Sequence, residues 1–129
     1  MKELVDALSK NLNIDRKQAT GGAAILFKAA RDRLGEQQFK SLVKGLAGVD
    51  DLIQKAPESG SVGRLFGGFA SALGGSNAAV LAGIVAGFGR LGLDTEHARD
   101  FVPVILEFLR AKVGVEKTEQ IERTIRSLW

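Results

Sequence analysis

Apolar residues recur at spacings of three and four along most of the chain, which is the period of an amphipathic helix. This pattern predicts helices over residues 4–12, 15–34, 36–44, 94–113 and 116–128, with a further helical turn near residues 50–53. No segment alternates apolar and polar residues for long enough to predict a strand. We therefore expect a compact all-α domain over residues 1–129, with six to eight helices.

Capping signals set the ends of the two long helices. Asp15 and Gln18 are three residues apart and have the form of a capping box, and Gly35 is expected to end the helix in the left-handed conformation. Asp94 is the predicted N-cap of the later long helix, which Gly114 ends. These signals predict two capped helices of similar length.

Pro103 lies inside the second of these helices. Proline is tolerated in a first turn but removes a hydrogen bond from a helix interior. We therefore expect either a fresh helix start capped by Asp100 or a tight kink close to that residue.

The glycine-rich middle of the chain, residues 60–90, has a different pattern. Residues 65–89 carry no charge, and the pattern predicts two helices, over residues 62–73 and 77–91. The second is apolar on all sides, which is typical of a buried central helix. A helical glycine costs about 1 kcal/mol relative to alanine. We therefore expect close packing against a neighbour along a small face that holds Ala79, Gly83 and Gly87.

Two consequences follow for packing. Replacing Gly83 by leucine is expected to destabilise the fold by about 1–3 kcal/mol through overpacking. The core is expected to contain eight large side chains, namely Phe27, Phe39, Leu81, Ile84, Phe88, Phe101, Ile105 and Phe108.

An offset of 79 residues aligns two parts of the chain without gaps. The possible pseudo-repeats are residues 12–44 and 91–128, and the offset places Asp15 opposite Asp94 and Gly35 opposite Gly114. Duplication would explain this match and would predict two pseudo-repeated helix pairs. Convergence would also explain it, because any two capped amphipathic helices of equal length share such positions.

Several segments resemble the bacterial VcgC/VcgE-like family of uncharacterised proteins. They are Lys2-Glu3-Leu4-Val5, Ala19-Thr20-Gly21-Gly22, the glycine-rich residues 67–75, Leu91-Gly92-Leu93-Asp94 and Phe101-Val102-Pro103-Val104-Ile105. The resemblance covers nearly the whole chain, and the segment after Gly114 contributes least to it. It implies a bacterial helical domain and brings no catalytic residues.

Membrane association is the alternative interpretation of the apolar hairpin 62–91. The uncharged stretch is long enough to span a bilayer, and the spacing of Ala79, Gly83 and Gly87 occurs in membrane helices. However, Gly74 and Gly75 interrupt the stretch, and each half is then too short to span. We therefore favour a buried core over membrane insertion.

Charge and cysteine content exclude several classes of site. The formal charge is only +3, and Lys28, Arg31, Arg33, Lys40 and Lys44 are interrupted by acidic residues, so there is no strong nucleic-acid signal. The absence of cysteine excludes disulfides and thiolate sites. The N-terminal residues do not form a secretory signal. The expected compartment is the cytoplasm, or the periplasm if the native protein carries a signal peptide that this sequence lacks.

The only histidine offers a weak candidate for chemistry. Glu96, His97 and Asp100 crowd the start of one helix and could form a metal site. N-terminal acids that complement the helix dipole explain the same residues more simply. No catalytic residue, cofactor or metal is therefore predicted.

The sequence thus favours a non-enzymatic protein-binding or assembly module. Its expected partner is another protein or a second copy of the chain, and Trp129 is a candidate partner contact. Membrane association is the second hypothesis, and an enzyme or metal binder around His97 is the third.

Overall fold

The computed structural model describes residues 2–46, 48–54 and 77–127, and within them it has seven α-helices and no strand. The helices are α1 (Lys2–Leu12), α2 (Arg16–Leu34), α3 (Glu36–Leu42), α4 (Val49–Gln54), α6 (Asn77–Arg90), α7 (Thr95–Val113) and α8 (Val115–Arg126). The prediction of an all-α bundle is confirmed. The predicted helix over residues 62–73 lies outside the described residues.

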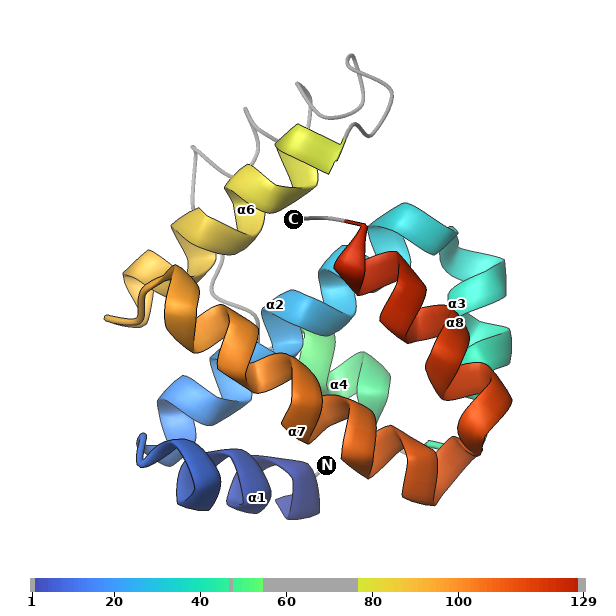
Figure 1. Ribbon diagram of the computed structural model, residues 1–129, viewed down its shortest axis with the longest axis horizontal. Helices are drawn as coiled ribbons and strands as arrows, with labels where there is room; N and C mark the ends of the chain where they lie inside the picture. Colours follow the sequence, from blue (N-terminus) through green and yellow to red (C-terminus); the bar gives the residue numbers. More distant parts are fainter. Residues whose placement is uncertain (1, 47, 55–76, 128–129) are drawn as a thin grey trace.

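The central helix of the bundle is α2, which contacts each of the other six described helices (Figure 1). It is rich in glycine and alanine, and its buried small residues are Ala19, Gly21, Gly22, Ala23, Ala24, Ala29 and Ala30. Small side chains let several helices approach one axis closely. A buried Gly/Ala-rich central helix was expected, but at residues 77–91 rather than here.

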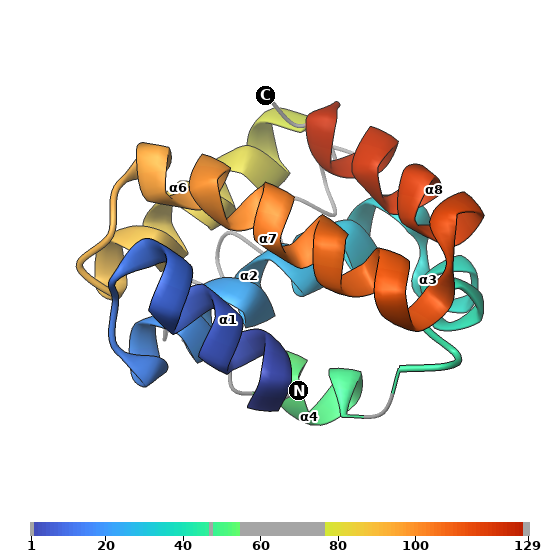
Figure 2. The same ribbon diagram turned by 60° about the horizontal axis from the view of Figure 1, so that its bottom comes forward.

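The helix that was expected at the centre, α6, lies at one edge of the molecule, and α3 and α8 lie toward the other end (Figures 1 and 2). It packs against α2 and α7. Ile84 and Phe88 are buried on its inner side, whereas Gly83 and Val85 are exposed. The prediction of an all-round buried helix is therefore wrong for α6. An all-apolar pattern does not distinguish an apolar face in the core from an apolar face in solvent.

Aromatic rings of two pairs of helices, α2 with α3 and α6 with α7, pack together in the core. Phe27 meets Phe39 with ring centroids 6.4 Å apart, and Phe88 meets Phe101 at 5.2 Å, both edge to face. Six of the eight predicted core residues are buried, namely Phe27, Phe39, Ile84, Phe88, Phe101 and Ile105. The other two, Leu81 and Phe108, are only partly buried.

The capping box predicted at the start of α2 is present. The Gln18 amide nitrogen donates to Asp15 Oδ1 at 2.7 Å, and the Asp15 amide nitrogen donates to Gln18 Oε1 at 3.2 Å. Gly35 ends α2 with φ of 92° and ψ of 151°. This conformation is not the left-handed helical one that was expected, although it also favours glycine.

The second long helix, α7, is continuous from Thr95 to Val113, with Pro103 inside it. The prediction of a fresh start at Asp100 is therefore wrong. Proline removes one hydrogen bond from the helix. However, Phe101 and Ile105 lie on either side of it, both buried, and their packing holds the helix together through this position.

The offset of 79 residues relates the elements of two halves, which we define as residues 2–54 and residues 77–127. Under it, α2 and α7 have identical bounds and 19 residues each, and α3 and α8 begin at equivalent positions. Gly35 and Gly114, between these helices, have φ of 92° and 93°.

The turns that precede the two long helices match as well. The Ile14 amide nitrogen donates to the Ser9 carbonyl at 3.2 Å, and the Leu93 amide nitrogen donates to the Phe88 carbonyl at 2.9 Å. The donors of these two hydrogen bonds are 79 residues apart in the sequence, and so are their acceptors. The correspondence therefore extends to α1 and α6, which precede those turns, beyond the residues that the sequence pattern aligned.

The two halves are packed into each other. Helix α1 contacts both α2 and α7, and its equivalent α6 contacts both α7 and α2. The first helix of each half thus lies between the long helix of its own half and that of the other half. Neither half encloses the core alone.

Candidate functional site

The outward-facing side of α6 is the most unusual surface among the described helices. It consists of Ala82, Gly83, Val85, Ala86 and Gly89, all exposed, and we call it the outer face of α6. At 100° per residue these positions fall within an arc of about 160°. Val85 is 44% exposed and is one of two large exposed hydrophobic residues in the described parts of the chain. These five residues carry no charge, and exposed Arg90, the last residue of α6, falls within the same arc at the end of the helix.

Helix α1 provides an internal comparison for this face. The residues 79 positions before Ala82, Val85 and Gly89 are Glu3, Asp6 and Lys10, which are also exposed. These three positions are therefore charged in α1 and uncharged in α6, whereas Gly83 corresponds to buried Leu4 and Ala86 to Ala7. Two of the α1 charges form exposed ion pairs, Asp6 with Arg16 and Glu3 with Lys112. The three corresponding α6 positions carry no charge that could form such pairs.

Close contacts with α2 hold α6 with this face outward. A Cβ atom added at Gly87 would lie 2.7 Å from Ile25 Cδ1, and one added at Gly21 would lie 2.8 Å from Leu91 Cδ2. Gln18 Nε2 also donates to the Leu91 carbonyl at 3.0 Å. Because these contacts lie on the opposite side of α6, the outer face remains free of neighbours in the described chain.

The predicted packing residues of α6 have different surroundings. Gly87 lies against Ile25, as described above. Gly83 has no atom within 4 Å of the place where its Cβ atom would lie. The expectation that Gly83 packs closely, and that leucine would overpack it, is therefore wrong, because the residue lies on the outer face. The side chain of Ala79 lies outside the described residues, as does Trp129.

His97 acts in the cap of α7. Its amide nitrogen donates to Asp94 Oδ1 at 3.0 Å, and its Nδ1 lies 2.7 Å from the same oxygen. These bonds, first the one from the backbone and then the one from the ring, hold the pKa of Asp94 below its usual value of 3.8. Glu96 and Asp100 are exposed. In the described residues, no three His, Cys, Asp or Glu side chains are grouped so that they could hold a metal ion.

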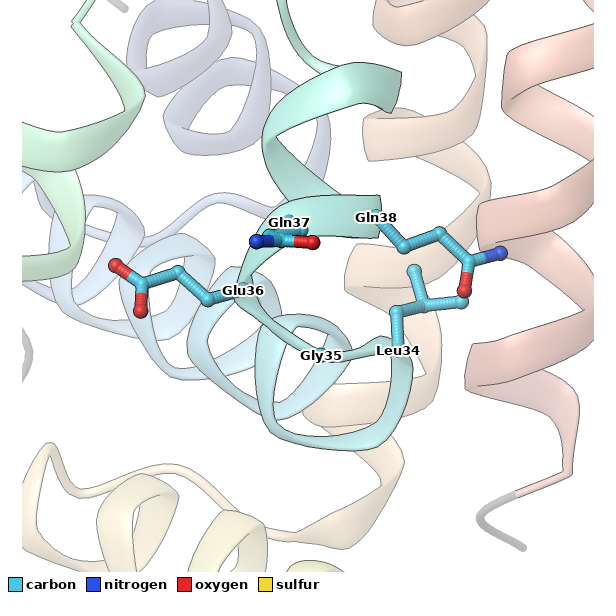
Figure 3. A pocket seen from close by; sticks show the side chains of 5 residues that line it. All are labelled: Leu34, Gly35, Glu36, Gln37 and Gln38. Carbon is cyan, nitrogen blue, oxygen red and sulfur yellow. The ribbon is translucent and has the colours of Figure 1, made fainter.

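A hollow of about 640 Å³ lies at the junction of α2 and α3. Its lining residues are Leu34, Gly35, Glu36, Gln37 and Gln38. Figure 3 shows that the Glu36 and Gln38 side chains point in opposite directions. Ligand sites need polar groups that converge on one point, so this arrangement does not favour a ligand.

A smaller hollow of about 310 Å³ lies between α1, α2 and α4. Lys2, Arg16, Thr20 and Asp51 line it. Arg16 forms an ion pair with Asp6, and Thr20 Oγ1 donates to the Arg16 carbonyl at 2.7 Å. Two of the polar groups are therefore already engaged within the chain.

The length of α6 bears on the membrane interpretation. Its 14 residues extend about 21 Å, at 1.5 Å per residue, whereas a bilayer hydrocarbon core is about 30 Å thick. No helix within the described ranges is both long enough and apolar enough to cross a membrane.

Comparison with known proteins identifies the family. A family model described as "Protein of unknown function VcgC/VcgE (DUF2780)" matches residues 1–123. The chain belongs to this family. The resemblance expected from the sequence is confirmed, and the match includes most of α8. No curated protein and no solved structure matches the chain. Membership of the VcgC/VcgE family assigns no activity and no catalytic residues.

Two features of the site were not predicted from the sequence. The first is the pair Gly21 and Gly22 in α2, which lie against Leu91 and Phe101. Two adjacent glycines inside a capped helix indicate close packing. Each glycine lowers helix stability by about 1 kcal/mol relative to alanine, and a close contact compensates for that loss. The second is the exposure of Val85, which can be recognised in the sequence only by comparison with α1.

Proposed function

We propose that the chain is a non-enzymatic helical module that binds another protein through the outer face of α6. One observation supports this proposal above the others: three exposed positions of this face are uncharged where the equivalent positions of α1 are Glu3, Asp6 and Lys10. Contiguous exposed apolar surfaces on soluble domains mark interaction sites.

The composition of the face indicates the kind of partner. Ala82, Ala86 and Gly89 have minimal side chains, so a neighbouring backbone could approach α6 closely, and Val85 could insert between the side chains of that neighbour. An apolar face of a partner helix provides such a surface. The five residues of the face offer no polar side chain to a hydrophilic ligand, and Arg90 lies only at its end. The proposed partner is therefore a protein that presents an apolar helix face.

The proposed setting is the cytoplasm of a bacterial cell. The proposed module has no catalytic role and no resident cofactor. In this module, His97 and Asp94 form the N-terminal cap of α7. Glycines of α6 and α2 allow these helices to pack closely.

Site-specific photo-crosslinking in the native host tests the proposal. A benzophenone amino acid replaces Ala86 in one variant and Asp6 in a matched control at an exposed position of α1. We expect ultraviolet light to give one discrete protein adduct from residue 86 and none from residue 6. Adding Val85→Asp should remove the adduct, because it places an unpaired charge in the contact.

The identity of the adduct is then read by mass spectrometry. An adduct with another protein supports the proposal, and one with a second copy of this chain identifies the partner as the chain itself. Crosslinks only to lipid, or equal crosslinking from residues 6 and 86, would contradict protein binding through the outer face of α6.

A further inference from the structure

The hollow between α1, α2 and α4 is lined by charges of both signs. Its volume is about 310 Å³, and Figure 2 shows the start of α1 beside α4. Lys2 brings an ammonium group from α1, and Asp51 brings a carboxylate from α4. Val5 and Leu52, which are both buried, line its apolar part. The hollow therefore combines a cation, an anion and an apolar surface.

Lys2 and Asp51 lack the partners that a neighbouring charge has. Arg16 lines the same hollow and pairs with Asp6. Within the part of the chain that the structure describes, the side chains of Lys2 and Asp51 form no ion pair or hydrogen bond, although their charges are opposite. A ligand that carries both charges could bridge them with charge-assisted hydrogen bonds.

Arg16 and Thr20 add further hydrogen-bonding groups to the hollow. A guanidinium carries several N–H donors, and Arg16 engages Asp6 through Nη1. This ion pair holds the guanidinium in place and leaves other donors that can meet a carboxylate. Thr20 Oγ1 donates to the Arg16 carbonyl, and its oxygen can still accept a hydrogen bond from an ammonium group. Donors for a carboxylate thus come from α1 and α2, and acceptors for an ammonium group from α2 and α4.

The two cations of the hollow are not required by the packing of the repeated helices. Under the offset of 79, Lys2 corresponds to Leu81 and Arg16 to Thr95. Equivalent helices of the second half therefore form without a cation at either position. The charges around the hollow belong to the first half alone.

We propose that this hollow binds a small zwitterion, namely a free α-amino acid with an apolar side chain. Its carboxylate meets Lys2 and Arg16, its ammonium group meets Asp51 and the Thr20 oxygen, and its side chain lies against the apolar part. A simple anion would be repelled by the carboxylate, and a simple cation by the two basic groups. Ligand pockets usually enclose about 300–1,000 Å³, so this volume suits a small ligand. The proposal is independent of the outer face of α6.

Titration of the isotope-labelled full chain, followed by the NMR signals of its backbone amides, tests the ligand class. The probe is L-leucine, and its two matched controls are leucinamide, which lacks the carboxylate, and N-acetylleucine, which lacks the ammonium group. We expect saturable shifts of the Thr20 and Gly48 signals with leucine at millimolar concentrations, and at least roughly threefold weaker binding of each control. The absence of a saturable shift, or a control that binds as tightly as leucine, would overturn the proposal.

Variants of the two unpaired charges test the place of binding. Lys2→Gln and Asp51→Asn remove them, and the matched controls Lys10→Gln and Asp50→Asn change exposed residues of the same helices that do not line the hollow. Circular dichroism checks that each variant keeps its helices. We expect leucine to bind about three- to fivefold more weakly to the first two variants, on the scale of an exposed ion pair, and with native affinity to the controls. Native affinity in both Lys2→Gln and Asp51→Asn would overturn the proposal.

Discussion

Gly22 of α2 and Phe101 of α7 are equivalent residues of the two halves, and they lie against each other. A Cβ atom at position 22 would overlap the phenylalanine ring, which is itself fully buried. The Phe101 ring of one half therefore fills the space that Gly22 of the other half, which has no side chain, leaves in the core.

This pair gives a first prediction. Gly22→Ala is expected to lower the free energy of unfolding by about 1–3 kcal/mol, because a buried aromatic ring cannot move aside cheaply. Urea unfolding measures the loss. The same substitution in a Phe101→Leu background should cost less, since the smaller side chain leaves room. Equal losses in the two backgrounds would show that the ring is not the obstacle.

Gly83 gives a prediction of the opposite sign. It is helical and exposed, and no atom lies near the place of its Cβ atom. Gly83→Ala is therefore expected to raise the free energy of unfolding by roughly 0.5–1 kcal/mol through helix propensity alone. Gly87→Ala is the matched control in the same helix, and contact with Ile25 should reduce its gain. A loss of stability from Gly83→Ala would mean that the outer face is covered.

The cap of α7 predicts how the free energy of unfolding changes at acid pH. Because the pKa of Asp94 is lowered in the folded chain, its carboxylate form stabilises the fold. This stabilisation is complete above the unfolded pKa of about 3.9 and is lost as the pH falls through the lower folded value. Asp94→Asn keeps an acceptor for the His97 amide but does not titrate. The advantage of the native chain over this variant in urea unfolding should shrink between pH 6 and pH 3, and a constant difference would contradict the assignment.

Substitution of Val85 distinguishes an effect on partner binding from an effect on folding. Because its side chain is exposed, Val85→Asp should change the free energy of unfolding by no more than about 0.5 kcal/mol. Asp6→Val is the reciprocal change on α1. If Val85→Asp unfolds the purified protein, the residue belongs to the core and the outer face has been misassigned.

The helices themselves were largely predictable from the sequence, because their signals are local. Asp15 with Gln18, Asp94, Gly35 and Gly114 fix helix ends through hydrogen bonds that reach only a few residues along the chain. The fresh start predicted at Asp100 from Pro103 is wrong, because the helix continues through the proline, where Phe101 and Ile105 are buried on either side.

The place of each helix in the bundle was less predictable. Helices α2 and α6 are both rich in small residues, and the more apolar one was expected at the centre. The central helix is instead α2, where Lys28 and Asp32 are exposed while most of the small residues are buried. Which neighbours surround a helix depends on contacts between residues far apart in sequence, and periodicity does not encode those contacts.

Cysteine reactivity in living cells tests the central claim, that the outer face of α6 is a protein-binding surface, most directly. Val85→Cys and Asp6→Cys introduce single thiols at equivalent exposed positions of α6 and α1, in a chain with no other cysteine. In the purified protein, both should react with a maleimide at similar rates. In the native host, we predict that the thiol at position 85 is protected while the thiol at position 6 still reacts. Equal reactivity of the two thiols in the cell would contradict the claim.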